Sequence, residues 1–129
     1  MTTAFSEFDL QPQLLQTIAD IGYTEPTPIQ STVIPAMLAG QDVIGQSQTG
    51  SGKTAAFSLP TLHNLQSHQR HVQSLVVTPT RELAIQVADA MHTYGRQTGV
   101  RVLAVYGGQP YDRQIRGLKK GVEVVVGTP

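Results

Sequence analysis

The chain has 129 residues, enough for one domain, and its 40% hydrophobic content is typical of a soluble globular protein. It contains no run of 18 apolar residues and no cysteine, which excludes an apolar transmembrane helix, disulfides and thiolate metal sites. The first residues, Met1–Phe5, lack the basic and apolar regions of a signal peptide, so we expect a cytoplasmic protein without membrane contact.

The formal net charge is zero, but the charges are distributed unevenly along the chain. Residues 1–52 contain five acidic residues and no lysine or arginine, whereas residues 53–129 contain all nine basic residues and four acidic ones. A polyanion would therefore meet the second half of the chain. With so few charges, uneven sampling is the alternative explanation.

Helical and extended patterns alternate along the chain. Apolar spacing and Gly or Pro boundaries predict helices over residues 13–21, 28–39, 53–66, 81–94 and 110–118. Short apolar runs predict buried strands over residues 42–45, 72–77, 100–105 and 123–126, and residues 67–71 form a polar loop. Strands that alternate with helices indicate an α/β fold, in which a parallel sheet is flanked by helices.

The segment Ser47–Thr54 has the features of a phosphate-binding loop. It reads Ser-Gln-Thr-Gly-Ser-Gly-Lys-Thr and lies between the predicted strand 42–45 and the predicted helix that begins at Lys53. Its glycines allow backbone N–H groups to face an anion, Lys53 can reach the outer phosphates, and the Thr54 hydroxyl is placed to hold Mg²⁺. Ser47 replaces the first glycine of the strict pattern, and a chance Gly-Ser turn is the alternative.

Three further loops follow predicted strands, at the sheet edge where ligands of such folds bind. They are Thr78–Arg81, Tyr106–Gly108 and Gly127–Pro129, and they offer hydroxyls, backbone N–H groups and an arginine. These groups suit the sugar-phosphate backbone of a nucleic acid. Ordinary strand-to-helix turns explain the same residues equally well.

In these segments the chain resembles the N-terminal part of a DEAD-box RNA helicase. Gly22–Gln30, with Phe5 upstream, is similar to the Q motif of that family, and Ser47–Thr54 is similar to its P-loop, where Ala or Ser commonly comes first. Pro79–Ala84 resembles motif Ia, Gly107-Gly108 the double-glycine element, and Thr128-Pro129 the start of motif Ib. The resemblance covers nearly the whole chain and implies a P-loop NTPase domain of the RecA-like type.

The resemblance implies ATP and Mg²⁺ as cofactors and RNA as the partner. Gln30 would contact N6 and N7 of adenine, Tyr23 would stack on the base, and the backbone carbonyl of Glu25 would meet N6. The phosphates would lie on Ser47, Gln48, Thr49, Gly50, Ser51, Gly52, Lys53 and Thr54, of which Lys53 and Thr54 serve catalysis and Thr54 holds the metal. The RNA backbone would lie on Pro79, Thr80, Arg81, Gly107, Gly108 and Thr128.

Each of these roles has a structural alternative. Gln30 alone would be a surface glutamine of a helix, Tyr23 a half-buried core aromatic, and Arg81 an ion-pair partner. Phe5 is expected to pack rather than to contact a ligand. The basic residues within residues 110–120 form a loose basic face of a helix, namely Arg113, Arg116, Lys119 and Lys120. We expect this face to be exposed to solvent, and contact with RNA is the second interpretation.

The resemblance also implies that this domain is incomplete. No adjacent Asp-Glu pair is present to hold Mg²⁺ and position water, so we expect residues 1–40 to form the Q-motif helices and residues 41–129 a core that stops before that motif. Such a chain would bind ADP or ATP without turnover. A non-catalytic adenine-nucleotide or RNA-binding module is the alternative, and a P-loop kinase or DNA helicase agrees less well with the Q motif.

The family's strand order leads to a further expectation. The strand near 123–126 should lie between those near 72–77 and 100–105, while the strand at 42–45 should have no partner among them. Unpaired strand edges would then favour self-association, a rearranged sheet or a marginally stable fold.

Overall fold

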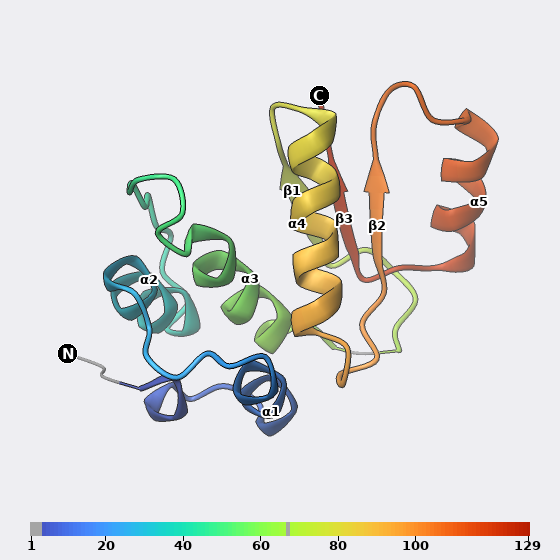
Figure 1. Cartoon of the computed structure of the whole chain (residues 1–129). Coiled ribbons are helices and arrows are strands. Elements are labelled where there is room, and N and C mark those ends of the chain that lie inside the picture. The colour runs from blue at the N-terminus through green and yellow to red at the C-terminus, as the bar shows by residue number, and fades with distance from the viewer. Residues whose placement is uncertain (1–3, 67) are drawn as a thin grey trace. The chain divides into compact units, whose positions relative to one another are not determined.

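The chain folds into two compact units, which join between Asn64 and Leu65, in the computed structural model shown in Figure 1. The structure describes residues 4–66 and 68–129. Met1–Thr3 and Ser67, which the sequence analysis assigns to an N-terminal segment and a polar loop, lie outside the described residues. No helix in the described part of the chain is both long and apolar enough to cross a membrane.

The first unit is helical. It contains the short 3-10 helix η1 (Phe5–Glu7) and the helices α1 (Pro12–Asp20), α2 (Pro28–Leu38) and α3 (Lys53–Asn64). Helices α2 and α3 pack against each other, and Leu14, Ile18, Ile34 and Leu59 are fully buried. Burial of an aliphatic side chain of this size stabilises a fold by about 1.5–3 kcal/mol, so these four residues account for much of the unit's cohesion.

A pair of hydrogen bonds ties the start of α1 to the end of α3. The backbone N–H of Gln11 donates to His63 Nδ1 at 3.0 Å, and the Gln11 side-chain amide donates to the His63 carbonyl at 2.7 Å. Helix α1 ends before Gly22, whose φ of +90° is a conformation that glycine adopts without strain. The predicted helices 13–21 and 28–39 are therefore confirmed within one or two residues.

The predicted buried strand 42–45 is wrong. Residues 41–48 form no helix or strand, and the Ile44 side chain is 94% exposed. A strand needs hydrogen-bonded neighbours, and the strands that the structure describes pair only with one another. This agrees with the expectation that residues 42–45 find no partner among them.

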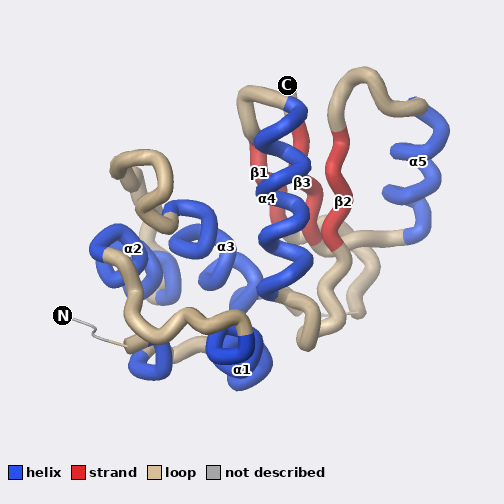
Figure 2. The backbone as a smooth tube through the Cα atoms, viewed as in Figure 1, coloured by secondary structure: helices blue, strands red, loops and turns tan. Residues whose placement is uncertain are grey.

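The second unit is built on a parallel sheet of three strands, β1 (Ser74–Val77), β2 (Val102–Val105) and β3 (Val124–Gly127), shown in Figures 1 and 2. Their order is β1-β3-β2, with Val77 and Val105 both in register with Gly127. The predicted strand order is confirmed, and each strand is shorter than predicted or shifted by one residue. The centre strand is buried along its whole length, as expected for a run of valines between two neighbours.

Two helices complete this unit. Helix α4 (Arg81–Tyr94) connects β1 to β2 and packs on β2 and β3, and its predicted apolar face of Ala84, Val87, Ala88 and Met91 is buried. Helix α5 (Tyr111–Lys120) connects β2 to β3 and approaches β2 closely, since a Cβ at Gly117 would lie 3.1 Å from the Leu103 methyl groups. It begins one residue later and ends two residues later than predicted.

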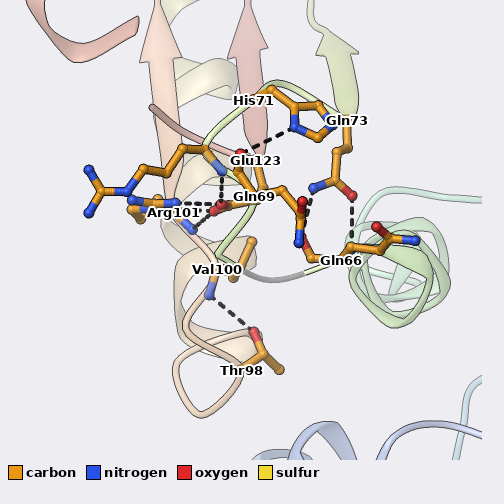
Figure 3. Close-up of polar contacts among 9 residues, drawn as sticks. Gln66, Gln69, His71, Gln73, Thr98, Val100, Arg101 and Glu123 are labelled. Carbon is orange, nitrogen blue, oxygen red and sulfur yellow. Dashed lines mark hydrogen bonds and ion pairs between the residues drawn. The ribbon is translucent and has the colours of Figure 1, made fainter. Parts of the chain in front are cut away.

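A buried carboxylate joins the amino ends of the strands. Glu123, which directly precedes β3, is fully buried and accepts hydrogen bonds from the Arg101 backbone N–H at 2.8 Å and the Arg101 Nη2 at 2.6 Å. The Arg70 backbone N–H donates to the same carboxylate at 3.3 Å. Figure 3 shows these contacts beside a second pair of hydrogen bonds, between Gln73 and Gln66. The Gln73 Nε2 donates to the Gln66 carbonyl at 2.7 Å, and the Gln66 N–H donates to Gln73 Oε1 at 2.8 Å.

The hydrogen bonds outweigh the cost of burying the Glu123 charge. Burial of the Glu123 carboxyl raises its pKa. The hydrogen bonds from Arg101 and Arg70 together lower the pKa by more than burial raises it, so that the pKa falls from 4.5 to about 2. A lowered pKa means that the contribution to stability is complete above pH 4.5 and is lost as the pH falls towards 2.

We expect Glu123→Gln to lower the free energy of unfolding by about 2–3 kcal/mol, because it leaves the Arg101 guanidinium without its carboxylate. In urea titrations the difference between the two proteins should be constant above pH 4.5 and should shrink between pH 4.5 and 2. Glu82→Gln, at an exposed ion pair, is the matched control and should change stability little. A difference that stays constant down to pH 2 would contradict the role of the charge.

Candidate nucleotide and nucleic-acid sites

The phosphate-loop segment is an exposed turn that leads directly into α3. Gly50 and Gly52 have φ values of +82° and +90°, and the Ser51 N–H donates to the Gln48 carbonyl at 3.2 Å. Helix α3 begins at Lys53, so the segment ends at a helix N-terminus, where backbone N–H groups and the helix dipole favour an anion. The predicted loop and helix are present, whereas the predicted strand before them is absent.

The polar side chains of this loop contact the loop itself. Lys53 Nζ donates to the Ser47 carbonyl at 2.7 Å, and the hydroxyls of Ser47 and Ser51 are hydrogen-bonded to each other. Lys53 is exposed, so its ammonium group is accessible from solvent. Ser47 thus has a local role that the strict glycine of the motif could not fill.

Gln30 connects α2 to the phosphate loop. Its Oε1 accepts from the Thr27 N–H at 2.9 Å, its Nε2 donates to the Gly52 carbonyl at 3.1 Å, and the residue is only 4% exposed. A Cβ at Gly52 would lie 2.3 Å from Gln30 Nε2, so this approach requires a glycine. The surface-glutamine alternative is therefore wrong, and the amide retains one N–H and one lone pair, the combination that an adenine edge requires.

Thr27 is the N-cap of α2 and belongs to the Gly22–Gln30 segment. Its Oγ1 is buried opposite the Gln30 backbone N–H, in a capping box that is completed by the bond from the Thr27 N–H to Gln30 Oε1, and a Cβ at Gly52 would lie 3.0 Å from the same hydroxyl. The hydroxyl thus lies beside the phosphate-loop segment while it caps α2. The position of a threonine directly before the Pro of a helix start was the only signal in the sequence.

The aromatic residues of the Q-motif segment pack on each other. The rings of Phe5 and Tyr23 lie 5.9 Å apart with a 31° tilt, and Phe5 is buried. The Phe5 N–H also donates to the Thr24 carbonyl at 3.2 Å. Phe5 is a packing residue, as expected, while Tyr23 and Glu25 lie at the surface.

The three predicted loops of the second unit lie together at the carboxyl edge of its sheet, because the strands end in register. The Thr78 N–H donates to the Gly127 carbonyl at 2.8 Å, and the Thr128 N–H donates to the Val105 carbonyl at 3.2 Å. Five of the six residues predicted for RNA, Pro79, Thr80, Arg81, Gly107 and Gly108, are exposed, and Thr128 is half-buried.

Arg81 links two of these loops. A Cβ at Gly108, whose φ is +89°, would lie 3.0 Å from an Arg81 guanidinium nitrogen, so glycine gives this side chain room. Arg81 Nε also lies 3.4 Å from Glu82 Oε1 in an exposed pair. The Thr80 Oγ1 accepts from the Leu83 N–H at 3.2 Å and caps α4. The ion-pair alternative for Arg81 is therefore compatible with an exposed guanidinium at this edge.

The structure groups the predicted residues into two sets. Those predicted for nucleotide lie in the first unit, and those predicted for RNA lie in the second. Among the residues that the structure describes, His and acidic side chains form no cluster of three or more that could hold a metal ion.

Comparison with known proteins identifies the relatives of this chain. The family model for DEAD/DEAH box helicases matches residues 27–129. The chain is 53% identical over 126 residues to the ATP-dependent RNA helicase DeaD of Buchnera aphidicola, covering 97% of this chain and 21% of that protein. It is 51% identical over 127 residues to the DEAD-box ATP-dependent RNA helicase CshA of Bacillus cereus, covering 98% and 24%. The chain thus spans a fifth to a quarter of these relatives.

Solved structures give the same result. A DEAD box protein from Methanococcus jannaschii matches with a TM-score of 0.93 and 37% identity, over 99% of this chain and 35% of that one. A hypothetical ATP-dependent RNA helicase from Sulfolobus tokodaii matches with a TM-score of 0.82 and 42% identity, over 93% and 34%. The family match spans most of the chain and includes the phosphate loop, and we conclude that this protein belongs to the DEAD/DEAH box helicase family.

Proposed function

We propose that this chain is the nucleotide-binding portion of an ATP-dependent RNA helicase. The observation that carries the proposal is the Gln30 amide, which is hydrogen-bonded to the backbone of the phosphate loop and still has a free donor and acceptor. The names of the relatives agree with this function. In the longer protein, RNA-stimulated ATP hydrolysis would open short duplexes locally.

The adenine nucleotide would lie across α2 and the start of α3. Gln30 would recognise the base edge, with Tyr23 against the ring and the Glu25 carbonyl at N6, while Ser47–Thr54 and the N-terminus of α3 hold the phosphates. Mg²⁺, when bound, would neutralise charge on the phosphates, and the Thr54 hydroxyl is the residue that would hold it. The division into Q-motif helices 1–40 and a core 41–129 and a cytoplasmic location belong to this proposal.

RNA would bind at the carboxyl edge of the second unit. Its phosphates would meet the exposed Arg81 guanidinium, the Thr80 and Thr128 hydroxyls, and the backbone at Pro79, Gly107 and Gly108. These groups contact sugar and phosphate rather than base edges, so this binding would not depend on sequence.

The edge of β1 would support self-association. In the sheet that the structure describes, β1 pairs only with β3, and its Leu75 and Val77 side chains are 66% and 62% exposed. The strand carries no charge and no proline that would block pairing with another chain. A second copy of this chain would satisfy both the unpaired backbone and the exposed apolar side chains.

The first prediction for this site concerns adenine. Gln30→Ala should weaken ATP binding by about 1–3 kcal/mol, because a bidentate contact to the base edge is lost. Gln30→Glu keeps the acceptor for Thr27 but lacks the donor, and should lose most of the preference for ATP over GTP. Calorimetric titration with both nucleotides measures this, with Gln13→Ala on exposed α1 surface as the control. Equal affinity of the unmodified chain for ATP and GTP would refute the adenine site.

The second prediction concerns the phosphates. Lys53→Ala should weaken ADP and ATP binding by about 1.5–3 kcal/mol, because a charged hydrogen bond to phosphate is removed. Arg116→Ala removes an exposed positive charge from α5 and should leave nucleotide affinity unchanged. If the two variants weaken binding equally, Lys53 acts only through net charge and the phosphate loop is not the site.

The third prediction concerns β1. Sedimentation velocity should show a concentration-dependent dimer or higher oligomer, which Leu75→Lys should convert to monomer because it places a charge on the exposed face of the edge strand. Ile85→Lys introduces the same charge at an exposed position of α4 and should not change the distribution. A monomer at all concentrations in the unmodified chain would contradict self-association.

A further inference from the structure

The excess positive charge of the second unit lies away from the predicted RNA edge. Residues 65–129 contain eight basic and four acidic residues, a net charge of +4. Arg81, Arg113 and Arg116 are balanced in number by Glu82, Asp89 and Asp112. The whole excess therefore comes from the amino-edge cluster, which we define as Arg70, Arg96, Arg101, Lys119 and Lys120 together with the buried Glu123.

The fold brings this cluster together from separate segments at the amino ends of the strands. The Arg70 backbone and the Arg101 guanidinium bond the same oxygen of Glu123, at 3.3 and 2.6 Å. A Cβ at Gly121, just after Lys119 and Lys120, would lie 2.8 Å from the Arg70 Cβ. Arg96 follows the end of α4. Figure 3 shows Arg101 and Glu123 at this end of the strands.

The backbone of the cluster adopts uncommon conformations where its segments meet. Arg70 has a φ of +57°, which is uncommon for a residue with a side chain, and the glycine at 121 has a φ of +99° where the two segments touch. Arg70, Lys119 and Lys120 are exposed, and no described residue forms an ion pair with them. Cations in the last turn of a helix are favourable by themselves, but that effect explains only the lysines of α5.

We propose that the amino-edge cluster is a second contact for the phosphate backbone of RNA, separate from the carboxyl edge. A cluster of arginine and lysine, in which Arg70, Lys119 and Lys120 form no ion pair with a described residue, is the electrostatic footprint of a nucleic-acid site. Helix α4 has 14 residues and is about 21 Å long, so the two edges are separated by about six stacked nucleotides. The cluster would bind the part of an RNA molecule that extends beyond the nucleotides at Arg81. This inference therefore rests on the proposed RNA binding at the carboxyl edge.

The test compares two lengths of RNA. The chain should bind an oligouridylate of about twenty nucleotides more tightly than one of about three, because only the longer strand reaches both edges. Lys119→Gln/Lys120→Gln should reduce this preference several-fold, and its salt dependence should become shallower by about 1.4, since each phosphate contact to a single strand contributes about 0.7. Both lysines are exposed, so the variant should fold, which circular dichroism checks.

Arg113→Gln/Arg116→Gln is the matched control, because it removes the same charge from the same helix outside the cluster. An unchanged length preference in Lys119→Gln/Lys120→Gln, or the same loss in the control, would overturn the proposal. Polyglutamate that competes as well as RNA would assign the cluster to an acidic protein instead. Arg81→Gln tests the carboxyl edge independently, since it should weaken binding of both lengths, and its failure would leave the amino-edge result intact.

Discussion

The second unit depends on the in-register pairing of its three parallel strands. Because Val77, Gly127 and Val105 are aligned across the sheet, the chain leaves all three strands at one edge and enters them at the other. A shift of one residue would turn the buried valines of β3 to the opposite faces. The same pairing therefore positions the exposed loops at the carboxyl edge and the Glu123 hydrogen bonds at the amino edge.

The two edges of this sheet have different chemistry. The carboxyl edge presents hydroxyls, backbone groups and one exposed arginine, which suits close approach to a sugar-phosphate chain. The amino edge is held by a buried carboxylate that stays ionised because the Arg101 side chain and the backbone N–H groups of Arg70 and Arg101 donate to it. Structural and electrostatic roles are combined there, since the carboxylate that neutralises the Arg101 charge also connects the segments of Arg70 and Arg101.

In the first unit, one side-chain amide connects α2 to the phosphate-loop segment. Gln30 is buried between the Thr27 backbone and the Gly52 carbonyl, so the start of α2 and the phosphate loop are held by the same group. The glycine at 52 allows this approach because any side chain would overlap the amide. The residue that we propose to recognise the base is thus hydrogen-bonded to the loop that we propose to hold the phosphates.

The sequence by itself determined most of the elements, because their signals are local. Pro28 after Thr27, Gly22, Gly40 and Gly121 at helix ends, and the apolar face of α4 each reflect a preference of the nearby backbone, and the structure agrees within two residues. The phosphate loop was visible for the same reason. Only the tertiary structure decided that residues 42–45 form no strand, since an apolar run becomes a strand only when neighbours accept its hydrogen bonds. It also decided that Gln30 is buried on Gly52, that the Thr27 hydroxyl lies beside Gly52, and that the Arg70 backbone and the Arg101 side chain both reach Glu123. Contacts between residues tens of positions apart leave no periodicity in the sequence, so packing alone determines them.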